Sequence, residues 1–242
     1  MKDVITEDID YAKSSEILKT YLGLSGSPVA VKLAKSPDEI PEGIEEIGEK
    51  MRHCQMVLKA RHEGDIFYAT SEKHLCMGGA WALGLRELTG SLKSGEFYYN
   101  LGKFGSWASS QRTMQQVPHV HLPGELAPPI YATVYAPLEK TPFDPHAVVI
   151  FGQPRMMLKL AQALIYKVGG RLNFSMAGIQ SVCADTVALP YMTGVANFSM
   201  GCDGSRKFSG ILDEDMVMGF PAEMLTEVAE AVQTVTGAPG SV

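Results

Sequence analysis

The residues best suited to chemistry in this chain are its four cysteines, Cys54, Cys76, Cys183 and Cys202. Successive cysteines lie 22, 107 and 19 positions apart, so none forms the close pair typical of a zinc ribbon or a ferredoxin. Four thiolates from anywhere in a fold can still hold an iron–sulfur cluster. We therefore predict that all four are metal ligands and that the cofactor is a [4Fe–4S] cluster. Zinc is the less favoured metal, because this chain is long enough to fold without a metal staple.

Glycines accompany two of the cysteines at points where a helix is expected to begin. One stretch is Cys76-Met77-Gly78-Gly79-Ala80, and the other is Gly201-Cys202-Asp203-Gly204-Ser205-Arg206. A helix N-terminus stabilises a thiolate, and small residues let a cofactor approach the backbone. Ser205 and Arg206 add donors suited to an anion. The predicted cofactor-binding residues are Gly78, Gly79, Gly201, Gly204, Ser205 and Arg206. The alternative for the second stretch is a tight Asp-Gly turn with an exposed arginine.

Helical and extended patterns alternate along the chain and must position these residues. Helices are predicted over 8–22, 51–61, 75–88, 107–117, 154–168, 182–189 and 222–235. Strands are predicted over 28–33, 65–70, 130–135, 147–151, 171–176, 196–200 and 216–218, and residues 91–105 are predicted to form a packed loop. Such alternation favours an α+β or α/β fold, with a mixed sheet flanked by helices.

A weak internal echo bears on domain organisation. Each half of the chain is predicted as strand, helix, glycine, strand and then a cysteine opening a helix, which gives Cys76 and Cys183 related positions. One interpretation is a single domain over 1–242 that contains two similar lobes, about 14–125 and 126–236. The other is that two unrelated α/β units resemble each other because such units often do.

Composition and charge exclude several classes of protein. Lys and Arg number 21 against 27 Asp and Glu, and a net charge of −6 argues against nucleic-acid binding. No segment approaches the ~18 consecutive apolar residues that cross a bilayer. The acidic start, residues 1–8, is unlike a secretory signal. We therefore expect a cytoplasmic protein without membrane contact, whose cysteines are thiols or metal ligands and not disulfides.

The cysteine motifs also carry a family resemblance. Cys76-Met77-Gly78-Gly79-Ala80 with Leu83-Gly84-Leu85, and Ala196-Asn197-Phe198-Ser199-Met200-Gly201-Cys202-Asp203-Gly204-Ser205-Arg206, resemble the uncharacterised ArCR family (domain of unknown function 169) of archaea and anaerobic bacteria. The resemblance covers about residues 14–232. It implies cysteines that recur within the family, and it implies no assigned reaction.

Three functions are consistent with these residues. The favoured one is an iron–sulfur protein with a redox role or a small anionic ligand near Arg206. The second is a cofactor-free ligand-binding or assembly module whose cysteines only pack. The third is a thiol enzyme with Cys202 as nucleophile beside Arg206. A small anionic substrate, a redox partner and a second copy of the chain are the partners left open.

Overall fold

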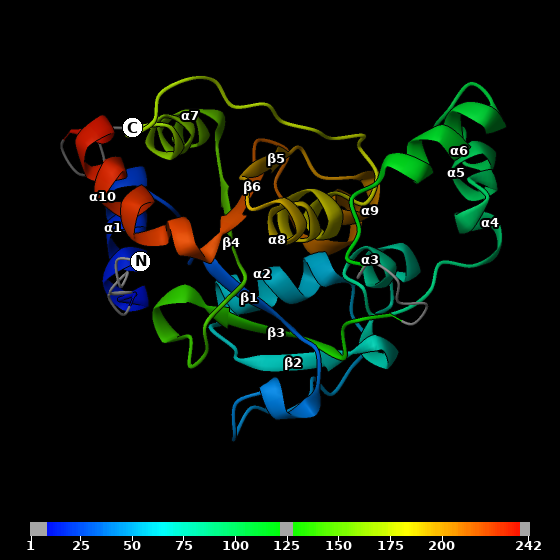
Figure 1. Ribbon diagram of the computed structural model, residues 1–242, viewed down its shortest axis with the longest axis horizontal. Coiled ribbons are helices and arrows are strands. Elements are labelled where there is room, and N and C mark those ends of the chain that lie inside the picture. Colours follow the sequence, from blue (N-terminus) through cyan, green and yellow to red (C-terminus); the bar gives the residue numbers. More distant parts are fainter. Residues whose placement is uncertain (1–8, 122–127, 238–242) are drawn as a thin grey trace, which may run out of the picture.

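A computed structural model describes residues 9–121 and 128–237 and shows helices on both faces of one open sheet (Figure 1). The predicted α+β class is confirmed, while the sheet, which was predicted to be mixed, is antiparallel. In the described part of the chain the strands are β1 (Val29–Ala34), β2 (Phe67–Thr70), β3 (Ala132–Pro137), β4 (Ala147–Gly152), β5 (Asn197–Ser199) and β6 (Met216–Pro221). Their order is β2-β3-β1-β4-β6-β5, and every neighbouring pair is antiparallel.

The helices divide between the two faces of the sheet. They are α1 (Tyr11–Leu22), α2 (His53–Glu63), α3 (Met77–Ala82), α4 (Gly90–Lys93), α5 (Glu96–Asn100), α6 (Trp107–Gln116), α7 (Pro154–Leu164), the π-helix η4 (Ser181–Ala188), α8 (Leu189–Thr193), α9 (Asp203–Ser209) and α10 (Leu225–Thr236), with short 3-10 turns η1 (Pro37–Glu39), η2 (Ser71–Lys73), η3 (Leu138–Lys140) and η5 (Ala222–Met224). Helices α1, α7 and α10 pack together on one face, and α2, α3 and η4 cover the other.

Two apolar cores result, one on each side of the sheet. Along β1, Val29 and Val31 point into the core under α2, while Ala30 and Ala34 point into the core under α1. Strands β3 and β4 are buried along their whole length. Because both faces are covered, these strands appear in the sequence as continuous apolar runs, which is why they were predictable.

The strand order relates the two halves of the sheet. Strands β2, β3 and β1 lie on one side and β5, β6 and β4 on the other, with β1 and β4 adjacent and Val29 opposite Val149. In each half, therefore, the first strand along the chain lies at the centre of the sheet, the third lies next to it and the second lies at the edge. Whether the halves are lobes that divide near residue 125 stays a prediction.

The π-helix η4 is fixed against the sheet by buried polar contacts. The Ser199 hydroxyl of β5 donates to the Asp185 carboxylate at 2.7 Å, and the Asn197 amide donates to the Asp185 carbonyl at 3.0 Å. Burial raises the pKa of Asp185 to about 7, and the bond from Ser199 opposes that shift. These contacts hold the turn of η4 that carries Cys183.

Several predicted elements need correction. No strand forms over 171–176, where Asn197 donates its amide to the Ser175 carbonyl and accepts from the Ser175 N–H in place of a neighbouring strand. The helix predicted over 75–88 ends at Ala82, and the helix predicted from Val182 is a π-helix. Residues 91–105 contain α4 and α5, and α9 was not predicted. Asp8, the first residue of the helix predicted over 8–22, lies outside the described residues.

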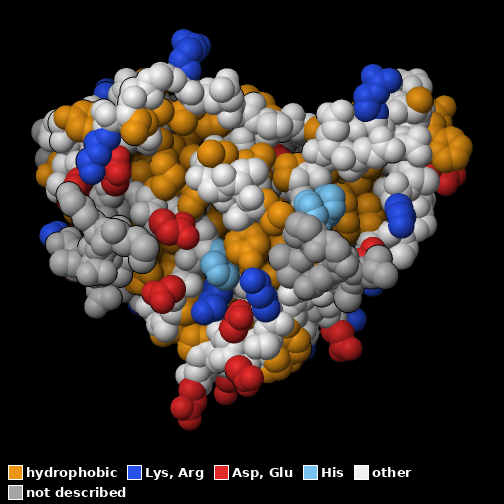
Figure 2. All heavy atoms as spheres, viewed as in Figure 1, with side chains coloured by type: hydrophobic (Ala, Val, Ile, Leu, Met, Phe, Trp, Pro, Cys, Tyr) orange, Lys and Arg blue, Asp and Glu red, His pale blue; other side chains and the backbone are white. Residues whose placement is uncertain are grey.

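Helices α4, α5 and α6 form an arm beside the main body, next to α3 (Figure 1). Large apolar side chains of the arm are exposed, among them Phe97, Leu101 and Trp107. Apolar surface is visible over the arm at the right of Figure 2. Within the described ranges, no helix is both long and apolar enough to span a membrane.

Candidate functional site

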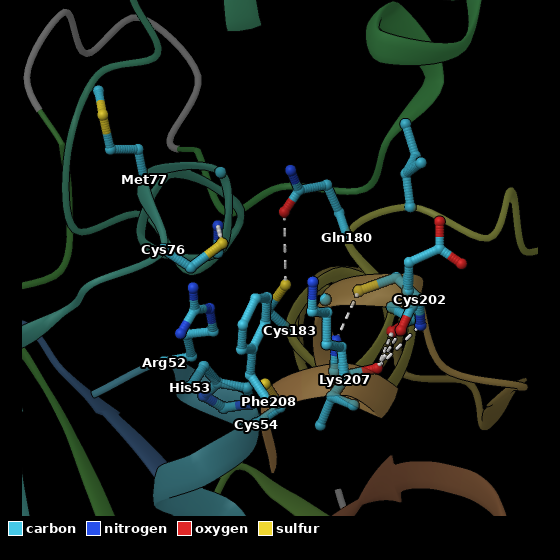
Figure 3. Close-up of a pocket in the computed structure, with 18 of the residues that line it drawn as sticks. Arg52, His53, Cys54, Cys76, Met77, Gln180, Cys183, Cys202, Lys207 and Phe208 are labelled. Atoms are coloured by element: carbon cyan, nitrogen blue, oxygen red, sulfur yellow. Dashed lines mark hydrogen bonds between the residues drawn. The ribbon is translucent and has the colours of Figure 1, made fainter. Parts of the chain in front are cut away.

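All four cysteines line one pocket on the face of the sheet covered by α2, α3, η4 and α9 (Figure 3). The cavity has a volume of about 590 Å³. Cys54 lies in α2 and Cys183 in η4, while Cys76 and Cys202 are the N-cap residues of α3 and α9. Four segments that are far apart in the sequence therefore meet in one place. That their thiols bind metal stays a prediction.

Cys76 and Cys202 have matching local structure. The Gly79 N–H donates to Cys76 Sγ at 3.4 Å, and the Ser205 N–H donates to Cys202 Sγ at 3.4 Å. Each cysteine follows the second strand of its half, and Cys54 and Cys183 each lie between the first and second strands. The topology thus relates Cys76 to Cys202 and Cys54 to Cys183, so the sequence echo that related Cys76 to Cys183 was wrong in its pairing.

The sulfurs are close enough to influence one another. A methyl group added at Gly79 would lie 3.6 Å from Sγ of both Cys76 and Cys183, so these sulfurs are at most twice that distance apart. Burial raises the pKa of Cys54 to about 12, with a further contribution from Cys202. Burial also raises the pKa of Cys183 well above its usual value. The neighbouring thiols of Cys76, Cys202 and Cys54 raise it further. Without a bound cation, these two groups are neutral thiols at pH 7.

The pocket is not a compact site for one ion. Zinc–sulfur bonds of about 2.3 Å place tetrahedral thiolates about 4 Å apart. Among residues 9–121 and 128–237, no group of three or more His, Cys, Asp and Glu side chains is arranged to hold a single metal ion.

Gln180 closes one side of the pocket. Its amide donates to the Tyr98 hydroxyl of α5 at 2.6 Å and accepts from Cys183 Sγ at 3.7 Å. Its φ of 51° is the one positive value among described residues other than glycine. A Cβ at Gly78 would lie 1.9 Å from the Gln180 amide nitrogen, so a side chain there would displace the Gln180 amide from this position. The arm, the π-helix and α3 are thus joined above the cysteines.

Replacing Tyr98 by phenylalanine is expected to destabilise this closure. The change leaves the Gln180 amide without its partner in a buried position, which costs about 1–3 kcal/mol in the free energy of unfolding. In the Tyr98→Phe variant, amide hydrogen exchange is expected to become faster in α5, while exchange in the distant helix α10 stays as in the unmodified protein. Tyr99→Phe is the matched control, because Tyr99 is exposed and outside the pocket. Equal stability of the two variants contradicts the role given to Tyr98.

Two residues predicted to bind a cofactor lie outside the pocket lining. The guanidinium of Arg206 donates to the carbonyls of Met200, Leu212, Asp213 and Asp215 at 2.7–3.3 Å. It therefore fixes the loops around α9 and does not face an anion. Gly201 lies beside it, with a φ of 83°. The remaining predicted residues line the pocket: Gly78, Gly79, Gly204 and Ser205.

Two buried histidines lie near the cysteines. His53 Nδ1 hydrogen-bonds the Tyr135 hydroxyl at 2.8 Å, and His74 Nε2 hydrogen-bonds Thr133 Oγ1 at 3.0 Å. Thr133 uses its own proton to reach the Ala69 carbonyl, so we assign the His74 proton to Nε2. The second nitrogen of each ring is buried and has no hydrogen-bond partner among the residues that the structure describes. Burial lowers the pKa of both histidines to about 3. The nearby His74 contributes to this lowering of the pKa of His53.

This burial predicts that the protein loses stability as the pH falls. The pKa of such a histidine is near 3 in the folded state and near 6.5 in the unfolded state. Between these two pH values the ring is neutral in the folded protein and binds a proton when the protein unfolds. The free energy of unfolding is therefore retained above pH 6.5 and falls below it, by up to about 1.4 kcal/mol per pH unit for each histidine. In urea titrations from pH 7 to 4, His74→Gln should show a shallower slope, and exposed His121→Gln should not. An unchanged slope in His74→Gln contradicts the assignment.

Sequence reasoning missed the charged residues of the pocket. Arg52, Lys103 and Lys207 line it, together with Asp203 and Phe208. Arg52 immediately precedes His53 and Cys54, and Lys207 and Phe208 come directly after the glycine-rich stretch that ends at Arg206. Their nearness to the cysteines in sequence was the available signal. Tyr98 belongs to an aromatic cluster whose position could not be derived.

The fold and pocket define an α+β protein with one antiparallel sheet, in which four cysteines from helices and helix N-caps of both halves of the chain line one pocket. A family model described as uncharacterised ArCR matches residues 17–231, so the chain belongs to this family. An uncharacterized protein of the archaeon Methanocaldococcus jannaschii is 46% identical over 206 residues, covering 85% of this chain and 86% of the relative. No solved structure matches. These findings carry no reaction with them.

Proposed function

We propose that this protein holds a [4Fe–4S] cluster through Cys54, Cys76, Cys183 and Cys202 and uses it in a redox reaction or in binding a small anion. The observation that carries the proposal is that the four thiols, drawn from separate segments, line a single cavity. Free thiols also suit a reducing compartment, and we place the protein in the cytoplasm.

The residues present fit such a cluster. Thiolates are its ligands, and two of the four sulfurs already accept backbone N–H groups, from Gly79 and Ser205. Gly78, Gly79 and Gly204 leave the neighbouring space free of side chains. Burial raises the pKa of Cys76, and the Gly79 N–H and the positive charge of Arg52 oppose that shift. When bound, a cluster of this kind supplies one-electron transfer or an iron that polarises a ligand.

The protein's own groups set the surroundings of the cofactor. The buried positions of Cys54 and Cys183 exclude water from one side, while Cys76 and Cys202 are partly exposed. Backbone N–H donation to sulfur stabilises negative charge there and tunes reduction potential. Arg52 contributes positive charge at the same side as Cys76. A cluster in this site would therefore be polarised between a buried and an accessible side.

The deciding experiment is analysis of protein that has been purified under strict anaerobiosis or reconstituted with ferrous iron and sulfide. We expect about four iron and four acid-labile sulfide per chain and an electron paramagnetic resonance signal after reduction with dithionite. Elemental analysis measures zinc in the same sample. Protein that takes up no iron and sulfide, or that contains one zinc per chain instead, overturns the proposal. In the first case the cysteines pack as apolar side chains.

A further inference from the structure

The mouth of the pocket carries an excess of positive charge. Of the charged residues that line it, Arg52, Lys103 and Lys207 are cations and Asp203 alone is an anion. Asp203 forms an ion pair with Lys103. Arg52 and Lys207 have no ion pair in the described part of the chain. This imbalance contrasts with the net charge of −6 of the whole chain.

Both unpaired cations lie against one aromatic ring. The Arg52 guanidinium carbon is 3.9 Å from the centroid of the Phe208 ring, and the Lys207 nitrogen is 5.3 Å from it. In Figure 3 the ring lies between the two side chains, and both extend toward the level of the cysteine sulfurs. A ring attracts each cation but leaves its charge in place. The two distances place the Arg52 guanidinium carbon and the Lys207 nitrogen at most 9.2 Å apart, so both positive charges can attract the same anion.

Much of the remaining cavity wall is apolar and partly aromatic. The arm contributes Leu92, Phe97, Tyr98 and Leu101, and α9 contributes Phe208. The volume of about 590 Å³ falls within the roughly 300–1,000 Å³ of pockets that take small organic ligands. It exceeds the space that the inorganic core of a cluster needs. The pocket therefore offers room, aromatic faces and two cations to the same ligand.

We infer that this pocket binds a small aromatic carboxylate, with the carboxylate on Arg52 and Lys207 and the ring against the apolar wall from the arm. A planar guanidinium matches a carboxylate with two parallel hydrogen bonds, and a lysine adds a point charge. Phe97 and Tyr98 of the arm give the pocket aromatic surface that suits a flat ring. The inference rests on the proposed function in one respect, namely that the cluster occupies the cysteine side of the same cavity.

The test uses benzoate as the probe and benzyl alcohol and inorganic phosphate as comparisons, titrated by calorimetry into the anaerobic holoprotein and into protein stripped of metal. Benzoate should bind, and Arg52→Gln and Lys207→Gln should each weaken its affinity about tenfold or more. Lys93→Gln is the matched control, because Lys93 is an exposed lysine of the arm that does not line the pocket. It should leave the affinity unchanged. Iron and sulfide are measured on every sample.

The outcomes separate this inference from the proposed function. A protein with full iron and sulfide that binds no benzoate, or binds it equally well in Arg52→Gln and Lys207→Gln, overturns the aromatic carboxylate and leaves the cluster. A protein that takes up no cluster but binds benzoate through these two residues supports the anion pocket and overturns the cluster. Binding of phosphate or benzyl alcohol as tight as that of benzoate also overturns the inference, because the carboxylate and the ring are both required.

Discussion

Replacing Cys183 by serine is expected to reduce the iron and sulfide content by more than about tenfold, because the change removes a ligand from the most enclosed side of the pocket. Cys183 lies in η4 and is 7% exposed. A serine hydroxyl there is a poor ligand for iron and also places a polar group in an apolar wall, which costs about 1–3 kcal/mol in the free energy of unfolding. Iron and acid-labile sulfide analysis after anaerobic reconstitution measures the first effect, and urea unfolding the second.

The control for Cys183→Ser must lose stability without losing a thiol. Val187→Ala serves, because Val187 is fully buried in the same π-helix and does not line the pocket. It should cost about 2 kcal/mol and still bind iron and sulfide at the level of the unmodified protein. Full iron content in Cys183→Ser would show that this thiol only packs. Equal iron loss in both variants would show that instability, and not ligand removal, empties the site.

Much of the framework was predictable because its sequence signals are local. Strands β3 and β4 are covered on both faces, so they are nearly continuous apolar runs. Helix α1 ends at Gly23, which adopts a φ of 67° and therefore gives a clear stop signal. Residues 171–176 alternate polar and apolar side chains as a half-buried strand does, but most of them are exposed and they pair with no strand of the described residues. A single sequence does not reveal that the partner is the Asn197 side chain.

The site was predictable in part for a similar reason. Cysteine is a distinctive residue type, and its convergence in one pocket was the assumption on which the prediction depended. The role given to Arg206 stays a prediction. The sequence did not show that four backbone carbonyls accept hydrogen bonds from its guanidinium, because these carbonyls come from loops whose approach only the fold determines. Arg52 and Lys207 were missed because the sequence around a charged residue does not show whether its side chain lines a pocket or forms an ion pair.

The π-helix shows the same limit on a larger scale. Residues 182–189 have a pattern that an ordinary helix would also have, and the sequence predicted one. The wider backbone of η4 lies directly against β6, where the Thr186 carbonyl approaches Gly219. The available signal was a glycine inside an otherwise apolar strand, which marks a site of close backbone approach. That contact helps to fix the position of η4, and therefore of Cys183, although Gly219 itself does not line the pocket.

Replacing Gly219 by alanine is therefore expected to destabilise the protein by about 4 kcal/mol or more and to remove the cluster site. The added Cβ would lie 1.8 Å from the Thr186 carbonyl oxygen and 2.6 Å from its carbon, both backbone atoms that cannot rotate aside. Strand β6 cannot retreat either, because Gly219 pairs with Val149 on one side and Asn197 on the other. The π-helix must move, and Cys183 moves with it. Urea unfolding and iron analysis measure the two effects.

Gly105→Ala is the matched control for this prediction. A Cβ at Gly105 would meet no atom within 4 Å, and the residue is exposed at the end of the arm loop before α6. The same change of one methyl group should alter the free energy of unfolding there by less than about 1 kcal/mol and leave iron content unchanged. If Gly219→Ala folds with the stability of Gly105→Ala and a full complement of iron, η4 is free to shift without consequence. The placement of Cys183 would then depend on the contacts of Asp185 with β5 and not on the strand beneath it.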